Sequence, residues 1–427
     1  MEVRDPIHGA IAVSPAEEQV VDHGFMQRLR NIKQVGFSEL AFPGAVHSRY
    51  NHSIGVMHLA GRGFDSALAN YAFSSPERRE QLRACVRLAA LLHDVGHAPF
   101  SHCTEFAMPP LRTLGIGVYD EGVQRERGEQ RATHEDYTIG IVTMAMGELI
   151  QENFPFTSRH VAALISREVT LHDDFFVDQG LDLRQVLSQL VSSELDVDRL
   201  DYLVRDSYFS GARYGMVDTN WILSNLSVHI HDDRVGLALD RRALYAFDDF
   251  LISRYHMFVM VYFHHKSVVY EEMLKRYFTA PSCAYRIPSS IDAYLHVDDI
   301  DLWSHLRTSD DPWARALVGH RAWKRVQELH GTPASVDASQ ALARLAAEGI
   351  DTLSASSVGK LSRYSVFGQK RSSAPPIFVT GGLSGEAVTP LREATAIFDR
   401  YQDERRISRV YVAPENLARA RALVQVS

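Results

Sequence analysis

Leucine and valine recur at near-helical spacing at the start of the segment 87–105, and this spacing predicts a buried helix there. A second helix is predicted over 15–34, because Ser14, Pro15 and Glu17 form the pattern of a helix N-cap. Further helical patterns cover 158–207, 240–280 and 285–353. The distribution of apolar positions therefore predicts a mainly α fold.

The C-terminal stretch has a different pattern. Residues 376–380 and 409–413 are rich in strand-forming side chains and predict two strands around a helix near 390–402. Ser372 and Ser373, followed closely by two prolines, mark a boundary. We therefore expect a core domain at 1–280, a helical extension at 281–370 and a small α+β region at 371–427.

The composition is that of an ordinary globular protein, with 427 residues, 45% of them hydrophobic, and a net charge of -8. This mild acidity excludes a polycation that coats nucleic acid, so nucleic-acid binding would need a local basic patch. The three cysteines form no CxxC pair, which favours a reducing compartment. No apolar signal segment or membrane-length apolar run is found. We expect a cytoplasmic protein without a membrane span.

Four polar side chains are set into the segment 87–105, namely His93, Asp94, His97 and His102. Burying imidazole and carboxylate among leucines is costly unless these groups are paired, and a cation is a suitable partner. The adjacent His93 and Asp94 offer one nitrogen and one anionic oxygen to a single metal. Such a donor set suits Fe, Mn, Co, Ni or Zn. The alternative is a helix end whose polar groups satisfy each other.

Two more residues can complete a metal site. His52 lies near the start of a predicted helix and can act as a distant third ligand. Asp198, Tyr202 and Asp206 occur at i, i+4 and i+8, so they share one helix face, and Asp198 can supply an anionic fourth ligand. A structural salt-bridge ladder is the alternative interpretation of this stripe.

Two other stretches offer candidate site residues. His134 follows Thr133 at a cap-like helix start, where the helix dipole is expected to lower the imidazole pKa and suit it to acid–base work or phosphate contact. In the pattern at 240–280, Tyr262 and His264 are either core residues or a wall against a sugar or base.

Taken in order, these motifs resemble the HD-domain metal-dependent phosphohydrolases, and within them the deoxynucleoside triphosphate triphosphohydrolase branch. The similarity centres on His93-Asp94-Val95-Gly96-His97. It extends through the segments 5–9, 27–34, 42–56, 93–102, 133–135 and 196–206. The resemblance implies a helical HD fold and a homo-oligomer, either a dimer or a tetramer.

The resemblance also implies a role for each matching residue. The metal ligands would be His52, His93, Asp94 and Asp198. The acid–base group would comprise His97, His102, Glu105 and His134. Substrate contacts are expected from Gln34, Arg49, Arg199, Tyr202, Asp206, Tyr262 and His264. A nucleotide activator site is implied at Asp22, Gln27 and Arg30. The alternative interpretation is that these three are ordinary polar residues on a helix surface.

Two departures from the family pattern concern the substrate. Phe263 and His264 stand where the vertebrate enzyme has a Tyr-Gln pair, and Arg199 replaces a lysine. Sugar and base preference are therefore left open.

The implied reaction is metal-dependent hydrolysis of a (deoxy)nucleoside triphosphate at the α-phosphate, giving nucleoside and inorganic triphosphate, with Mg²⁺ on the β- and γ-phosphates. A second metal held by His97, His102 or His134 would suit phosphodiesters better. One alternative is therefore an HD-type nucleotide phosphodiesterase or nucleotidase. Another is a catalytically inactive scaffold that binds nucleotides or nucleic acid.

Overall fold

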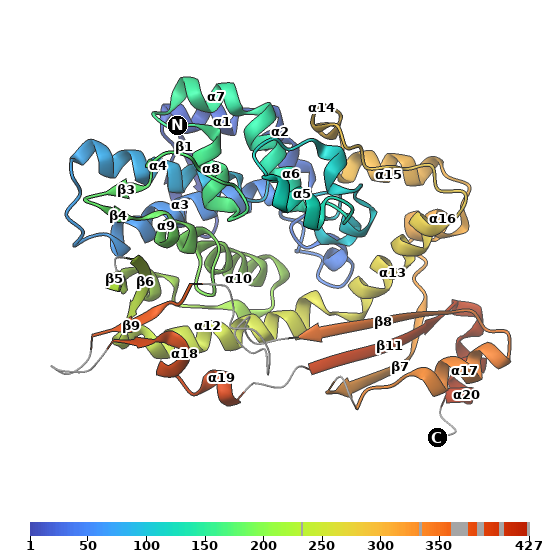
Figure 1. Ribbon diagram of the computed structural model, residues 1–427. Helices are drawn as coiled ribbons and strands as arrows, with labels where there is room; N and C mark the ends of the chain where they lie inside the picture. The colour runs from blue at the N-terminus through green and yellow to red at the C-terminus, as the bar shows by residue number, and fades with distance from the viewer. Residues whose placement is uncertain (232–233, 333–334, 360–374, 382–387, 401–404, 425–427) are drawn as a thin grey trace.

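The computed structural model describes residues 1–427 except 232–233, 333–334, 360–374, 382–387, 401–404 and 425–427. Helices dominate the described chain (Figure 1), which confirms the predicted mainly α fold. The first half contains α1 (Pro15–Val21), α2 (Gly24–Arg28), α3 (Arg49–Ala67), α4 (Pro76–Leu92), α5 (Glu121–Arg127), α6 (His134–Gly140), α7 (Gly147–Asn153), α8 (Ser158–Ile165), α9 (Arg184–Val191) and α10 (Val197–Ser210). The second half contains α11 (Thr219–Ser224), α12 (Leu244–Met257), α13 (His265–Thr279), α14 (Ile291–Tyr294), α15 (Asp299–Thr308), α16 (Pro312–Val318), α17 (Ser339–Ala347), α18 (Leu391–Ala394), α19 (Ile397–Arg400) and α20 (Leu417–Val424).

The centre of the helical body is formed by α3 and α4, with α10 packed against α3. α4 begins after the N-cap Ser75, and its second half is buried up to Leu92. α3 is buried along most of its length. A Cβ atom at Gly55 would lie 2.1 Å from Asp201 Oδ1, so only glycine lets α10 approach α3 this closely.

Two predicted helices are interrupted. The capping box at Ser14 and Glu17 is present, but the helix predicted over 15–34 stops at Val21, and His23 caps the separate α2. The pattern at 158–207 contains the hairpin of β3 (Val177–Asp178) and β4 (Leu181–Asp182). The two turn residues, Gln179 and Gly180, have positive φ angles of 52° and 79°, and a right-handed helix cannot continue through two such residues.

Two small sheets flank the helical body. β1 (Glu2–Asp5) pairs antiparallel with β2 (Gly9–Ala12). The second sheet has the order β10-β9-β6-β4-β3, and β5 also pairs with β6. Its remaining strands are β5 (Leu226–His231), β6 (Arg234–Asp240), β9 (Phe378–Thr380) and β10 (Thr389–Pro390). The strand predicted at 376–380 is confirmed by β9.

A third, antiparallel sheet lies below the helical body in Figure 1 and has the order β7-β11-β8. It consists of β7 (Lys324–Gly331), β8 (Thr352–Gly359) and β11 (Arg405–Val412). Together with α17 and α20 the sheet encloses a small core of its own, which includes Leu345, Val410 and Ala420. β11 confirms the strand predicted near 409–413.

The prediction of helix throughout 285–353 is wrong at 324–331, where β7 pairs with β11. The helix predicted near 390–402 is replaced by the two short helices α18 and α19. The predicted boundary at Ser372 and Ser373 lies outside the described residues. β7 and β8 come from the predicted extension and β11 from the predicted C-terminal region, so one sheet spans both, and the domain division stays a prediction. In the described part of the chain, no helix has the length and apolar character needed to cross a membrane.

Candidate active site

The four predicted metal ligands converge from three helices. His93 and Asp94 directly follow the last residue of α4, His52 lies in the first turn of α3, and Asp198 lies in the first turn of α10. His52 Nε2 lies 3.0 Å from Asp198 Oδ1 and 3.5 Å from Asp94 Oδ2. His93 Nε2 lies 3.6 Å from the same Asp198 oxygen. Ligands that are 146 residues apart in sequence thus form one cluster, which we call the metal cluster.

A layer of hydrogen bonds orients both imidazoles. His52 Nδ1 donates to Asp201 Oδ2 at 2.8 Å, and His93 Nδ1 donates to the Ala90 carbonyl oxygen at 2.8 Å. Asp201 is itself held by Arg205 through bonds of 2.8 and 2.9 Å. Among the described residues, neither His52 Nε2 nor His93 Nε2 has a partner in hydrogen-bond geometry, although both are buried. Nitrogens fixed in this way are typical metal ligands.

The charges around His52 explain what this cluster can bind. Burial disfavours the charged imidazole, but the Asp198 and Asp201 carboxylates outweigh burial and raise the pKa of His52 to about 10. Burial likewise opposes ionisation of Asp94, yet His93 and Arg49 hold the pKa of Asp94 well below its usual range. The carboxylates thus draw positive charge to the ring nitrogen His52 Nε2. A divalent cation can supply this charge in place of the proton, so the residues present fit a metal ion.

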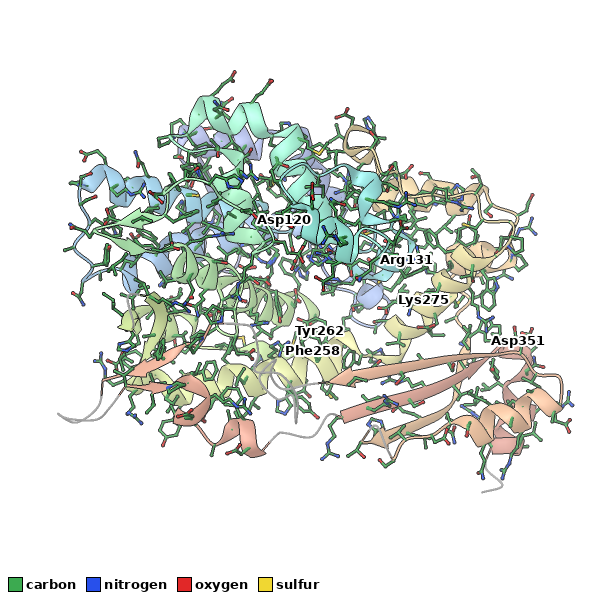
Figure 2. All side chains as sticks on the ribbon, in the orientation of Figure 1. Asp120, Arg131, Phe258, Tyr262, Lys275 and Asp351 are labelled. Atoms are coloured by element: carbon green, nitrogen blue, oxygen red, sulfur yellow. The ribbon has the colours of Figure 1, made fainter. Side chains whose placement is uncertain are left out.

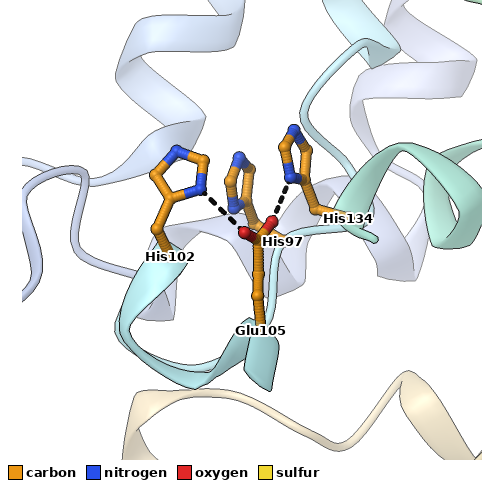
Figure 3. Close-up of side chains that lie close together, drawn as sticks. All are labelled: His97, His102, Glu105 and His134. Carbon is orange, nitrogen blue, oxygen red and sulfur yellow. Dashed lines mark hydrogen bonds and ion pairs between the residues drawn. The ribbon is translucent and has the colours of Figure 1, made fainter. Parts of the chain in front are cut away.

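The predicted acid–base residues form a second cluster, which we call the histidine–glutamate cluster (Figure 3). His134 Nδ1 donates to Glu105, and His102 Nδ1 lies 3.2 Å from the other oxygen of that carboxylate. The rings of His97 and His134 stack with their centroids 4.0 Å apart. His97 also connects the two clusters, because its Nε2 lies 3.2 Å from Asp94 Oδ1.

The two stacked imidazoles have opposite pKa shifts. Burial, together with Arg49 and His134, holds the pKa of His97 well below its usual range. Burial acts in the same direction on His134, but the ion pair with Glu105 outweighs it and raises the pKa. The prediction that the helix dipole lowers the pKa of His134 is therefore wrong, because a full carboxylate charge is stronger than the partial charge of a helix end. Neighbours with separated pKa values suit acid and base roles.

Close packing brings His134 to the loop after α4. A Cβ atom at Gly96 would lie 2.2 Å from the carbonyl oxygen of His134, so a larger residue would push α6 away. The Gly96 amide donates to Thr138 Oγ1 at 3.0 Å, which fixes the first turns of α6 against this loop.

Both clusters open onto one cavity of about 610 Å³. Its wall also contains the predicted substrate residues Gln34, Arg49, Tyr202, Asp206 and Tyr262. Tyr262 donates to Asp206 Oδ2 at 2.6 Å, while His47 Nε2 donates to Asp206 Oδ1 at 2.7 Å. Figure 2 labels three lining residues on the α12–α13 side, Phe258, Tyr262 and Lys275. Protein side chains thus surround a space large enough for a nucleotide-sized ligand.

Two predicted substrate residues are not part of the described cavity wall. Arg199 donates to the Ser193 carbonyl oxygen and pairs with Asp196 at 3.4 Å. His264 is the N-cap of α13, and its Nδ1 accepts the Lys266 amide. Their substrate contacts stay predictions.

The predicted activator residues gather around Tyr50. The Arg30 guanidinium lies 3.6 Å from the centre of the Tyr50 ring, and Arg30 Nε donates to Gln27 Oε1 at 2.7 Å. The charge of Asp22 also acts on this phenol. The three residues share one surface, and their function stays a prediction.

Sequence reasoning missed several residues of the site. Asp201, which orients His52, lies one helical turn after Asp198 and could have been found from that spacing. Glu271 and Lys275 on α13 and the strand segment 355–358 of β8 also line the cavity. β8 carries small side chains there, and nothing in their sequence marks them as part of a site.

Comparison with known proteins identifies two regions of the chain. Residues 49–204 match the model of the HD domain, and residues 217–334 match the model of the HD associated region. An uncharacterized protein of Methanocaldococcus jannaschii is 28% identical over 309 residues, which are 72% of this chain and 55% of the relative. The deoxynucleoside triphosphate triphosphohydrolase SAMHD1 of Gallus gallus is 27% identical over 329 residues, covering 74% of this chain and 52% of that protein. The chain thus spans about half the length of these curated relatives.

Solved structures support the fold over nearly the whole chain. A hypothetical protein from Aquifex aeolicus superposes with a TM-score of 0.74 at 24% identity, covering 99% of both chains. A phosphohydrolase from Bacteroides thetaiotaomicron superposes with a TM-score of 0.67 at 22% identity, covering 97% of this chain and 99% of that one. The HD motif and its buried His/Asp cluster agree with the family match, so residues 49–204 form an HD domain, the domain of the HD-type metal-dependent phosphohydrolases.

Proposed function

We propose that this protein hydrolyses (deoxy)nucleoside triphosphates at the α-phosphate and releases nucleoside and inorganic triphosphate. The observation that carries the proposal is that the metal cluster and the histidine–glutamate cluster open onto one cavity lined by Arg49, Tyr202 and Asp206. The relative from Gallus gallus is named for this reaction, which supports the choice of substrate class.

In this proposal, His52, His93, Asp94 and Asp198 hold a transition metal ion, namely Fe, Mn, Co, Ni or Zn. A divalent ion held there supplies Lewis-acid chemistry, which draws charge from a phosphoryl oxygen and lowers the pKa of water.

The remaining residues bind the substrate and move protons. Protonated His134, held at Nδ1 by Glu105, donates a proton from Nε2 to the leaving 5′-oxygen, with His102 as the alternative donor. Arg49 offers positive charge to the polyphosphate, whose β- and γ-oxygens carry Mg²⁺. Tyr262 and Asp206, already hydrogen-bonded to each other, offer a hydroxyl and a carboxylate to the sugar.

Product analysis tests this proposal. Metal-reconstituted protein is incubated separately with each dNTP and NTP, and the products are resolved by ion-exchange chromatography. Inorganic triphosphate and nucleoside in equal amounts are the expected products. Monophosphate with pyrophosphate would contradict the proposal, as would nucleotide binding without turnover, which favours the scaffold alternative.

One observation favours a second candidate function. Ligand atoms of His97, His102, Glu105 and His134 all lie within 4.8 Å of one another, so they could hold a second metal ion. Two adjacent metals suit phosphodiester cleavage, because they can stabilise both the attacking and the leaving oxygen. Two equivalents of bound metal and cleavage of a cyclic or linear dinucleotide would support this alternative.

Activation and assembly are separate proposals. Asp22, Gln27 and Arg30 would bind an activating nucleotide, and the chain would assemble as a dimer or tetramer. Turnover of a dNTP that appears only when a second nucleotide is added would support the activator site. Light scattering with and without that nucleotide measures the assembly.

A further inference from the structure

The loop between the two clusters is held by a segment far away in the sequence. Residues 95–101, which include His97, connect His93 and Asp94 of the metal cluster to His102 and Glu105. Residues 294–299, between the end of α14 and the start of α15, lie against this loop through hydrogen bonds to its backbone. The segment belongs to the HD associated region, outside the HD domain itself.

Two side chains hold the first half of the loop. The Tyr294 hydroxyl donates to the Gly96 carbonyl oxygen at 2.9 Å. Arg28 donates to the carbonyl oxygens of Val95 at 3.3 Å and His97 at 2.7 Å, and also to that of Val297 at 2.7 Å. The guanidinium of Arg28 lies over the Tyr294 ring, which keeps both donors in place.

Asp299 holds the second half of the loop. Its Oδ1 accepts the Phe100 amide at 2.6 Å, and its Oδ2 accepts the Lys33 amide at 3.0 Å. The carboxylate is 4% exposed and thereby links two backbone segments inside the protein. Both oxygens of one carboxylate are used, so an amide side chain could replace only one of the two bonds.

The backbone next to Asp299 needs this support. Phe100 and Ser101 have φ angles of 55° and 59°, in the left-handed region that side-chain-bearing residues rarely occupy. The 3-10 helix Ser101–Ala107 begins directly after Phe100 and carries His102 and Glu105. The direction in which these two side chains leave the backbone depends on the strained pair.

We propose that Asp299 is a positioning residue, which holds the left-handed Phe100–Ser101 turn so that Glu105 meets His134. Asp299 is not one of the residues that line the cavity, and it acts through the backbone of the loop. The consequence for catalysis rests on the proposed function, whereas the consequence for loop structure does not.

The test compares Asp299→Asn with Asp298→Asn at pH 8, where Asp299, whose pKa burial raises to about 7, is ionised. Asp298 is the matched control, because it caps α15 and accepts a hydrogen bond from Asn31, whereas among the described residues it has no hydrogen bond to the loop. Hydrogen–deuterium exchange followed by mass spectrometry reports on peptides from 98–107 and from α3 and α4. In Asp299→Asn we expect exchange at 98–107 to rise about tenfold while α3 and α4 stay unchanged.

Activity gives a second, independent readout. We expect kcat of Asp299→Asn to fall about 10- to 100-fold, with KM within about twofold and metal content unchanged, because misplacing a proton donor affects the chemical step. Asp298→Asn should keep both the exchange pattern and kcat of the wild type.

The outcomes separate this proposal from the proposed function. Unchanged exchange at 98–107, or a uniform rise throughout the protein, would overturn the positioning role. If the wild type releases no triphosphate, the proposed function is contradicted. Faster exchange at 98–107 in Asp299→Asn would still support the structural role of Asp299. If Asp299→Asn fails to fold, Asp299→Glu is used instead, because it keeps the charge but moves both oxygens away from the Phe100 and Lys33 amides. Unchanged exchange at 98–107 in that variant would overturn the proposal.

Discussion

The metal cluster and the histidine–glutamate cluster share a cavity but are built differently. In the metal cluster the side chains of His52 and Asp94 are 0% and 8% exposed, and fixed partners on neighbouring helices hold them. In the histidine–glutamate cluster the side chains of His102 and Glu105 are 64% and 28% exposed, and both lie on a 3-10 helix. The buried ligands of the first cluster are fixed by side chains of neighbouring helices, whereas the more exposed members of the second cluster pair with one another on a loop that is held through its backbone.

This difference matches two kinds of chemistry. A metal site gains affinity when its ligands are held in place before the ion arrives. A proton-transfer site must exchange protons with water and substrate, so part of it stays accessible. The following predictions test whether the two clusters separate metal binding from proton transfer in this way.

The largest effect is expected for Asp198→Ala. The substitution removes an anionic ligand, so metal content should fall to a small fraction of the wild-type value and kcat by about 10³-fold or more. Asp198 has a side-chain exposure of 32%, so the fold should persist, as circular dichroism would show. Full activity with stoichiometric metal would remove Asp198 from the metal cluster.

A smaller loss is expected for His134→Gln. Removal of the proton donor should lower kcat by about 10²- to 10³-fold while metal content stays at the wild-type level. His102→Gln is the comparison variant, and its greater exposure predicts a smaller loss of about tenfold. If His134→Gln instead loses a second equivalent of metal, the histidine–glutamate cluster is a metal site, and the contrast between the clusters fails.

The next prediction concerns Glu271, a carboxylate in the wall of the same cavity. Burial raises the pKa of Glu271 to about 7, although Lys275 opposes this shift. Because the folded protein binds this proton more tightly than the unfolded chain does, protonated Glu271 adds stability at low pH. This contribution is complete below about pH 4.5 and is lost as the pH rises through 7, so the free energy of unfolding should fall by roughly 2–3 kcal/mol between pH 5 and pH 8. Urea unfolding should show that Glu271→Gln avoids this loss.

Glu272→Gln is the matched control for that measurement, because Glu272 pairs with Lys275 on the same helix. Wild type and Glu272→Gln should lose stability in parallel as the pH rises. If Glu271→Gln also follows that curve, Glu271 is not the titrating group.

The smallest effect is expected for Asp201→Asn. An asparagine cannot accept from His8, His52 and Arg205 together, so His52 should be less well oriented and metal affinity should fall about 10- to 100-fold. Asp5→Asn is the control, because Asp5 accepts from Arg205 without touching His52. Equal metal affinities of the two variants in a competition titration would show that the orienting bond has no influence.

Local motifs in the sequence bring out three members of the metal cluster: His93 and Asp94 end an apolar helix, and Asp198 begins a polar stripe on another helix. His52 has no comparable motif, and the role of all four as metal ligands stays a prediction. The direction of the His134 pKa could not be predicted in the same way. It depends on Glu105, whose proximity is a result of tertiary packing.

The C-terminal sheet shows where local pattern fails. Residues 324–331 include Gln327, Glu328 and Leu329, which have good helix propensity, yet the segment is a strand because β11 pairs with it. At the turn Gln179-Gly180 both φ angles are positive, but the first position lacks the Asn, Asp or Gly that usually marks such a hairpin, so the helical pattern of 158–207 hides it. The contribution of β8 to the cavity wall requires the three-dimensional arrangement, because its small side chains carry no motif.

The position of β11 has a consequence for the order in which the protein is made. β11 lies between β7 and β8, but the ribosome produces it after both. N-terminal parts of a chain fold as they emerge, so the helical body can assemble while the partners of β11 still lack their central strand. The stretch 355–358 of β8 therefore reaches its final place in the cavity wall late in synthesis. Until β11 has paired with β8, this side of the cavity lacks a fixed wall.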